Sequence, residues 1–85
     1  MKPKQRHIDC FLEIVRQGTI AGAAEQLSVT QPAISRTLAD LETILETRLM
    51  ERSRSGISLT PSGETFLRYA SASASALDRG VQQVA

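Results

Sequence analysis

The sequence has few of the residues from which catalytic, redox or metal sites are built. Its 85 residues include one cysteine, Cys10, and one histidine, His7. One cysteine cannot build a disulfide framework or a thiolate metal site within a chain, and His7 has no metal partners at a workable spacing. A chain this short can bury a modest core but cannot also enclose a deep substrate cavity. We therefore expect no enzyme, no metal site and no cofactor in this domain.

Long apolar runs are absent as well. No stretch approaches the roughly 20 apolar residues that span a bilayer, and the amino end lacks the continuous apolar segment of a secretory signal. Together with the lone cysteine, which lies inside an apolar run, these absences predict a cytoplasmic protein that works without a membrane.

A large excess of one charge is also missing, because ten basic and nine acidic residues leave a formal charge of +1. This total is low for a nucleic-acid binder, so a prediction of nucleic-acid binding depends on how the charges are distributed. Arg48, Arg52 and Arg54 lie close together in the chain, whereas acidic residues at 40, 42 and 46 lie just before them. We expect a polarised surface instead of a uniformly basic one.

The first third of the chain predicts two helices. Apolar residues repeat at helical spacing from Gln5 to Gln17, and Gly18 follows the last turn as a helix stop would. Thr19 can cap a second, shorter helix. The inner face of that helix is expected to consist of Ile20, Ala23, Ala24 and Leu27, and the turn after it of Ser28 and Val29.

A third helix is predicted to begin at Thr30 or Gln31 and to end between Leu45 and Thr47. Thr30 can cap its first turn, and Pro32 lies where a backbone N–H would lack an intrahelical partner anyway. The stripe that would face a core consists of Ile34, Leu38, Leu41 and Leu45. The opposite side carries Pro32, Arg36, Ala39 and Thr43, flanked by Ser35 and Asp40. An apolar back and a hydrogen-bonding front are what a helix inserted into a DNA major groove requires.

The remaining residues predict a hairpin and a long helix. Two short runs flank a polar link that contains glycine, so we expect a β-hairpin with Arg54 at its tip. Thr60 and Pro61 then open a helix that continues to the end of the chain. Its apolar seam consists of Phe66, Ala70, Ser73, Leu77, Val81 and Val84.

Two interpretations of that last helix remain open. It could fold back to cap its own domain, since a small domain needs every apolar face, or it could pair two chains. We prefer dimerisation, because the helix outlasts the three-helix core that it could cover. A chain that ends on a half-apolar helix is also expected to be a fragment.

The order of these elements and several motifs resemble the amino-terminal domain of LysR-type transcriptional regulators, over essentially all 85 residues. The most specific motifs are VTQPAISR at 29–36, LMER at 49–52 and LTPSG at 59–63. Gly18, Thr19 and Ile20, the run AAEQL at 23–27, and the pair Leu41 and Glu42 add to the match. So many matches in register are hard to obtain by chance.

The resemblance implies a mainly helical, winged helix-turn-helix fold over residues 1–60. The helix-turn-helix would cover about 20–45 and the wing about 49–59, followed by a linker and dimerisation helix over 61–85. It also implies a sequence-specific transcription regulator that binds double-stranded promoter DNA as a homodimer on a pseudo-palindromic site, and forms a tetramer at full length. The effector domain that would bind a small-molecule inducer is absent from this chain.

The family motif assigns DNA-binding roles to individual positions. The residues that match positions approaching bases in the major groove are Gln31, Pro32, Ser35 and Arg36. Thr30 and Arg52 fall where backbone contacts are expected. Thr19, at a helix start, and Arg54, on a wing that would reach the minor groove, are further candidates for DNA contact.

Several of these residues also permit simpler interpretations, and Arg52 and Arg54 could be ordinary solvated charges. Arg36 could pair with Asp40 one turn later, Gln31 could merely cap its helix, and Ser35 could bond back to the preceding turn. For the whole chain, the alternative is a helical protein-interaction or dimerisation module that never touches DNA.

The sequence departs from the family pattern at two informative positions. Glu46 stands where glycine is usual, so the end of the third helix is expected to be less sharply set. Ser55 stands where an arginine near the wing tip is common, which leaves Arg54 as the nearest substitute. Insertion of the wing is therefore less secure than insertion of the helix.

Overall fold

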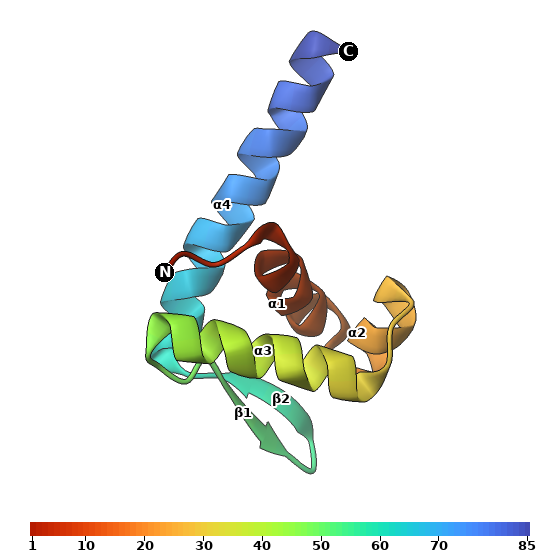
Figure 1. The fold of residues 1–85 in the computed structure, drawn as a ribbon, viewed down its shortest axis with the longest axis vertical. Coiled ribbons are helices and arrows are strands. Elements are labelled where there is room, and N and C mark those ends of the chain that lie inside the picture. The colour runs from red at the N-terminus through yellow and green to blue at the C-terminus, as the bar shows by residue number, and fades with distance from the viewer.

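The computed structural model describes residues 1–85 and contains four helices and one hairpin (Figure 1). In chain order these are α1 (Gln5–Gln17), α2 (Ile20–Leu27), α3 (Gln31–Leu45), β1 (Met50–Ser53), β2 (Gly56–Leu59) and α4 (Pro61–Val84). The first three helices pack together, the hairpin lies beside α3, and α4 projects away from them. The predicted fold class, a winged helix-turn-helix followed by a long helix, is confirmed.

The core lies where the three helices meet. Phe11, Ile14 and Leu41 are fully buried, and Ile34 and Leu38 continue the stripe expected on α3. The other buried apolar residues are Cys10, Ala23, Ala24, Leu49, Met50 and Ala70. The inner face predicted for α2 is wrong at its last member, because Leu27 is 37% exposed.

Three of the helices have a threonine as their N-cap residue. The hydroxyl oxygens of Thr19, Thr30 and Thr60 accept backbone N–H bonds from the residues three positions later, at 2.9, 3.2 and 3.0 Å. Such caps satisfy N–H groups that have no partner inside the helix. The three starts predicted from the sequence are therefore confirmed with their physical cause.

The end of α3 differs from expectation. Glu46 adopts a left-handed backbone conformation, with φ 55°, and ends the helix at Leu45. The N–H of Glu46 then donates to the carbonyl of Thr43, and the N–H of Thr47 to the carbonyl of Glu42. The helix is thus closed by the left-handed cap that glycine usually provides, and the expectation of a less sharply set end is wrong.

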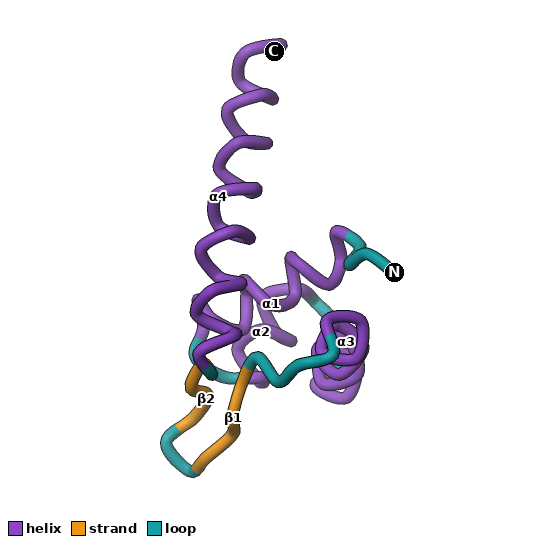
Figure 2. Tube along the Cα trace, turned by 90° about the vertical axis from the view of Figure 1, so that its left-hand side faces the viewer, coloured by secondary structure: helices purple, strands orange, loops and turns teal.

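The hairpin is antiparallel, and Met50 pairs with Leu59 and Ser53 with Gly56. Arg54 and Ser55 form its two-residue turn, so the predicted tip is confirmed. Met50 is buried against the core, whereas the rest of β1 is exposed. The wing is therefore anchored at its base and open to solvent at its tip (Figure 2).

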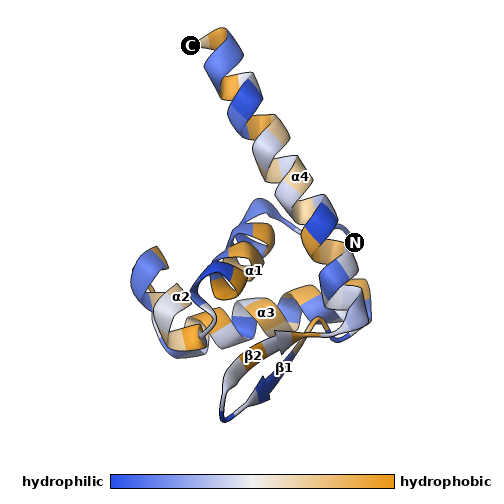
Figure 3. Cartoon of the chain, turned by 180° about the vertical axis from the view of Figure 1, so that it is seen from behind, coloured by the Kyte–Doolittle hydropathy of each residue, from blue (hydrophilic) through white to orange (hydrophobic).

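The last helix has two different halves. Near its start, Phe66 packs edge to face against Phe11, with ring centroids 5.2 Å apart, and Ala70 is buried. Beyond this point α4 leaves the domain, and Leu77, Val81 and Val84 are 59%, 58% and 88% exposed. Apolar and polar residues alternate along this free half (Figure 3). The first half of α4 thus caps its own domain, as one interpretation expects. The second half leaves an apolar seam without a partner, as the dimerisation interpretation requires.

None of the four helices combines the length and apolar character needed to cross a membrane.

Candidate functional site

The start of α3 presents its polar residues outward. Gln31, Pro32 and Arg36 are exposed, and Ser35 is half-buried. Thr30 provides the side-chain cap, whereas the Gln31 side chain makes no hydrogen bond within the protein. The simpler interpretation of Gln31 as a cap is therefore not what the fold shows, and its amide is free to bind a ligand.

The arginines around α3 and the wing differ in how they are paired. Arg48 is held by the carboxylates of Glu42 and Glu51, at 3.8 and 3.9 Å. Arg36 makes no ion pair with Asp40, and neither Arg52 nor Arg54 contacts a carboxylate. Three cationic side chains on this part of the molecule therefore carry charge that is not neutralised locally.

The wing is tied to α3 near the start of that helix. Nη2 of Arg52, on β1, donates a hydrogen bond to Oγ of Ser35 at 2.8 Å. Ser35 does not bond back to the preceding turn, although Thr37 and Thr43 on the same helix do so. The backbone-bonded interpretation of Ser35 is therefore wrong, and its hydroxyl belongs to the surface between helix and wing.

A second tie, which no pattern in the sequence predicted, lies near the other end of α3. Oε2 of Glu42 accepts the backbone N–H groups of Leu49 and Met50, at 2.7 and 3.3 Å. The same carboxylate faces Arg48, whose Nη2 also donates to the carbonyl of Met50 at 3.3 Å. Glu42 is part of a family motif, but nothing in the sequence indicated which groups its carboxylate would bind. The base of β1 is thus fixed to α3 by a side chain.

Several of the predicted DNA-binding residues come together at one cleft. Thr19 at the start of α2, Gln31 at the start of α3 and Arg52 on β1 all line it. Arg52 also lines a neighbouring cleft with Ser35. Arg54 lines neither cleft, since it lies in the turn at the wing tip. Arg52 is therefore the residue that joins helix starts and wing into one surface.

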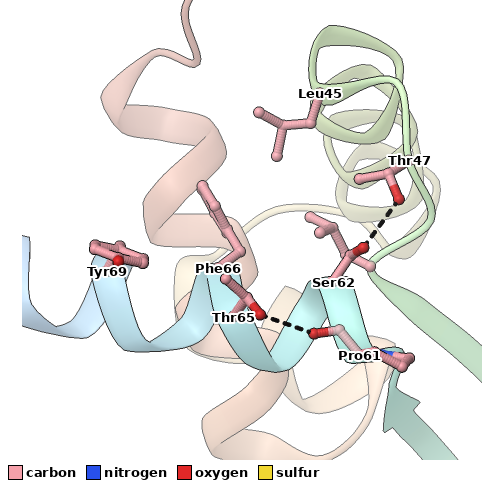
Figure 4. Close-up of a pocket in the computed structure, with 8 residues that line it drawn as sticks. Leu45, Thr47, Pro61, Ser62, Thr65, Phe66 and Tyr69 are labelled. Carbon is pink, nitrogen blue, oxygen red and sulfur yellow. Dashed lines mark hydrogen bonds between the residues drawn. The ribbon is translucent and has the colours of Figure 1, made fainter.

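A separate apolar groove lies where the end of α3 meets the start of α4 (Figure 4). Its volume is about 450 Å³, and the residues that line it include Leu45, Leu49, Pro61, Phe66 and Tyr69. Across one side Thr47 donates to the hydroxyl of Ser62 at 3.3 Å. None of the predicted DNA-binding residues lines this groove, whereas Phe66 of the predicted α4 seam does.

The helix starts and the wing lie within a region that matches a known protein family. Residues 5–64 match the family described as bacterial regulatory helix-turn-helix protein, lysR family. The chain is 43% identical over 81 residues to the HTH-type transcriptional regulator PcaQ of Agrobacterium fabrum, covering 95% of this chain and 26% of that protein. It is 40% identical over 65 residues to TdcA of Escherichia coli, covering 76% of this chain and 21% of that regulator. The chain thus spans about a quarter of the length of these relatives.

Solved structures agree on the fold. A complex of the BenM DNA-binding domain with the catB site 1 DNA superposes with a TM-score of 0.89 at 32% identity, covering 95% of this chain and 91% of that one. A complex of the CbnR DNA-binding domain with DNA gives 0.85 at 35% identity, covering 94% and 92%. The similarity extends over nearly the whole of both chains in each case.

Proposed function

Since this chain belongs to the LysR family of bacterial regulatory helix-turn-helix proteins, we propose that it is the DNA-binding domain of a transcription regulator. In this proposal α3 enters the major groove with its first turns, and the wing lies along the neighbouring minor groove. The DNA complexes of BenM and CbnR support this assignment, because their folds superpose on nearly the full length of this chain. A cytoplasmic location and the absence of enzymatic activity follow from the same proposal.

The observation that carries the proposal is the polar face at the start of α3, on which the exposed side chains of Gln31 and Arg36 have no partner within the protein. Arg36 is exposed and free of Asp40, so its guanidinium can reach O6 and N7 of a guanine with two hydrogen bonds. Gln31 makes no bond within the protein and can pair with adenine through its amide. Pro32 has no donor, so its role at a base is apolar contact, for example with a thymine methyl group.

Contacts to the DNA backbone are proposed for the residues around this face. Thr19 and Thr30 begin α2 and α3, where backbone N–H groups and the helix dipole attract phosphate oxygens. Arg52 and Arg54 add cations on the wing, and a narrow minor groove favours such cations. These contacts would hold the protein on the duplex.

We propose that two chains pair through α4. Leu77, Val81 and Val84 leave the domain as an exposed seam, which a second copy would cover. Ser73 belongs to the same seam and is exposed, whereas Phe66 and Ala70 already pack on the chain's own core. The free half of the helix would therefore supply most of the interface. A twofold pair of this kind matches a pseudo-palindromic site.

Selection from a randomised duplex library tests the proposal directly. The chain should enrich a pseudo-palindromic sequence, and its affinity for that duplex should fall steeply as salt rises, because bound phosphates release counterions. Failure to bind any duplex between about 50 and 200 mM salt would favour the rival function, a protein-interaction module. The exposed seam on α4 is the observation that favours a protein-interaction module.

The pairing of α4 is tested by sedimentation of two glutamate variants. Leu77→Glu places a charge in the seam and should convert dimers to monomers at micromolar concentration. Ser75→Glu is the matched control, because Ser75 is exposed on the opposite side of the same helix. Equal behaviour of both variants would contradict pairing through this seam. Tetramers and a small-molecule inducer, which the family resemblance implies for the full-length protein, stay predictions.

A further inference from the structure

We propose that Arg52 is a positioning residue that turns the hydroxyl of Ser35 into a hydrogen-bond donor for a base. The inference rests on the proposed DNA-binding function and adds a determinant of sequence preference to it. Its starting point is the 2.8 Å bond from Nη2 of Arg52 to Oγ of Ser35, which joins the wing to the helix placed in the major groove.

The chemistry of the two groups fixes the direction of this bond. A guanidinium has only donors, whereas a hydroxyl has one donor and two acceptor lone pairs. Ser35 must therefore accept from Arg52, and its own hydrogen has to point elsewhere. The usual alternative is the carbonyl one turn back, the bond that Thr37 makes to Ala33 and Thr43 to Ala39. Ser35 makes no such bond, so its hydrogen is available to an external acceptor.

The direction of the hydroxyl sets which bases it can serve. In the major groove, guanine offers O6 and N7, adenine offers N7 and thymine offers O4 as acceptors, whereas cytosine presents an amino donor. A serine free to rotate would tolerate either kind of group. Arg52 occupies one of the two lone pairs and turns the O–H away from the wing, so Ser35 should donate better than it accepts and should prefer a base with an acceptor over cytosine at the contacted position.

The wing holds this arrangement because it is fixed to α3 at two points. Ser35 and Glu42 are seven positions apart on α3, which separates the two ties by about 10 Å along the helix axis. Glu42 anchors the base of β1 through Leu49 and Met50, and Ser35 meets Arg52 further along the strand. Helix and wing should therefore approach DNA as one body.

The experiment measures a ratio, the affinity for the selected duplex divided by the affinity for duplexes changed at single base pairs. Ser35→Ala and Arg52→Ala should both lose discrimination at the same base pair, by about fivefold, the worth of one hydrogen bond. The double variant should lose no more than either single one. Arg54→Ala is the matched control, because it removes a wing arginine that has no tie to α3, and should weaken all duplexes equally.

Two results would overturn the inference. One is an Arg52→Ala chain that loses affinity for every duplex by the same factor and keeps its base preference, as a phosphate contact alone would. The other is loss of preference at different base pairs in the Ser35→Ala and Arg52→Ala chains. Thermal unfolding of each variant confirms that it is folded before its ratio is read.

The free protein separates this inference from the proposed function. In amide spectra without DNA, Arg52→Ala should shift the signal of Ser35, and Arg54→Ala should leave it in place. A shifted Ser35 signal in a chain that binds no duplex would reject the DNA-binding function while retaining the tie. An unshifted signal in a chain that does bind DNA would reject the positioning role alone.

Discussion

The backbone N–H of Leu49 donates to Oε2 of Glu42 at 2.7 Å, and this bond fixes the base of the wing to α3. Glu42→Ala would leave that N–H without its partner, and the free energy of unfolding should fall by about 1 to 3 kcal/mol. Glu42→Gln keeps a carbonyl oxygen as acceptor and should lose less. Urea unfolding of the three proteins measures both differences. Equal losses in the two variants would show that the side-chain oxygen is not what holds the strand.

The left-handed residue at the end of α3 predicts a stabilising substitution. Glu46 has φ 55°, a conformation that costs a residue with a Cβ atom about 1 kcal/mol. Glu46→Gly removes this strain and should raise the free energy of unfolding. The gain is smaller than the strain itself, because glycine has greater freedom in the unfolded chain.

Glu46→Ala provides the control for that substitution. It removes the same charge but keeps a Cβ atom, so its stability should stay close to that of the parent chain. A gain of the same size in both variants would assign the effect to the charge and not to the backbone.

Two glycines of α4 should respond in opposite directions to alanine. A Cβ at Gly63 would overlap the backbone carbonyl of Leu49, and backbone cannot yield as a flexible side chain can. Gly63→Ala should therefore destabilise the chain or displace the start of α4. A Cβ at Gly80 would meet open space, so Gly80→Ala should stabilise the helix by about 0.5 to 1 kcal/mol. Thermal unfolding followed by circular dichroism compares the two, and a tolerated Gly63→Ala would contradict the packing of α4 on Leu49.

The buried thiol predicts a change of stability at high pH. Burial raises the pKa of Cys10 from 9.0 to about 11, so the folded chain keeps this proton at pH values where the unfolded chain has lost it. The corresponding stabilisation is complete below pH 9.0 and is lost as pH rises toward 11. The free energy of unfolding should fall more steeply over this range in the parent than in Cys10→Ala. Parallel curves would show that the thiol does not contribute.

Reactivity of the same thiol can be measured independently. A raised pKa and burial both suppress the thiolate, so iodoacetamide should modify Cys10 slowly at pH 8 in the folded chain and quickly in urea. Fast modification of the folded chain would show that this part of the core opens readily.

The local signals of the sequence predicted the fold well because each helix start is set by residues within one turn. Thr19, Thr30 and Thr60 each cap the N–H group three positions later in the chain, so their roles depend on nothing distant. The same is true of the two-residue turn that Arg54 begins.

The ties between elements could not be predicted in this way. Glu42 binds residues seven and eight positions later, and Arg52 binds Ser35 across 17 positions, so both bonds exist only after the wing has packed beside α3. Periodicity predicts an inward-facing Leu27, but no neighbouring element covers the end of α2 enough to bury it. Local signals thus predicted the helix starts and the turn, whereas the bonds between α3 and the wing could not be predicted from them.

The most direct test of the account concerns Arg36, the exposed and unpaired arginine on the face of α3 that is proposed to read DNA. Dissociation constants for the selected duplex and its single-base-pair variants would be measured for the parent chain, Arg36→Ala and Arg79→Ala. Arg79→Ala removes the same charge from the free half of α4, on the side opposite the seam. We predict that Arg36→Ala loses about 1 to 3 kcal/mol of discrimination at one base pair, whereas Arg79→Ala keeps the full preference. An Arg36→Ala chain with the sequence preference of the parent would contradict reading of DNA by this face.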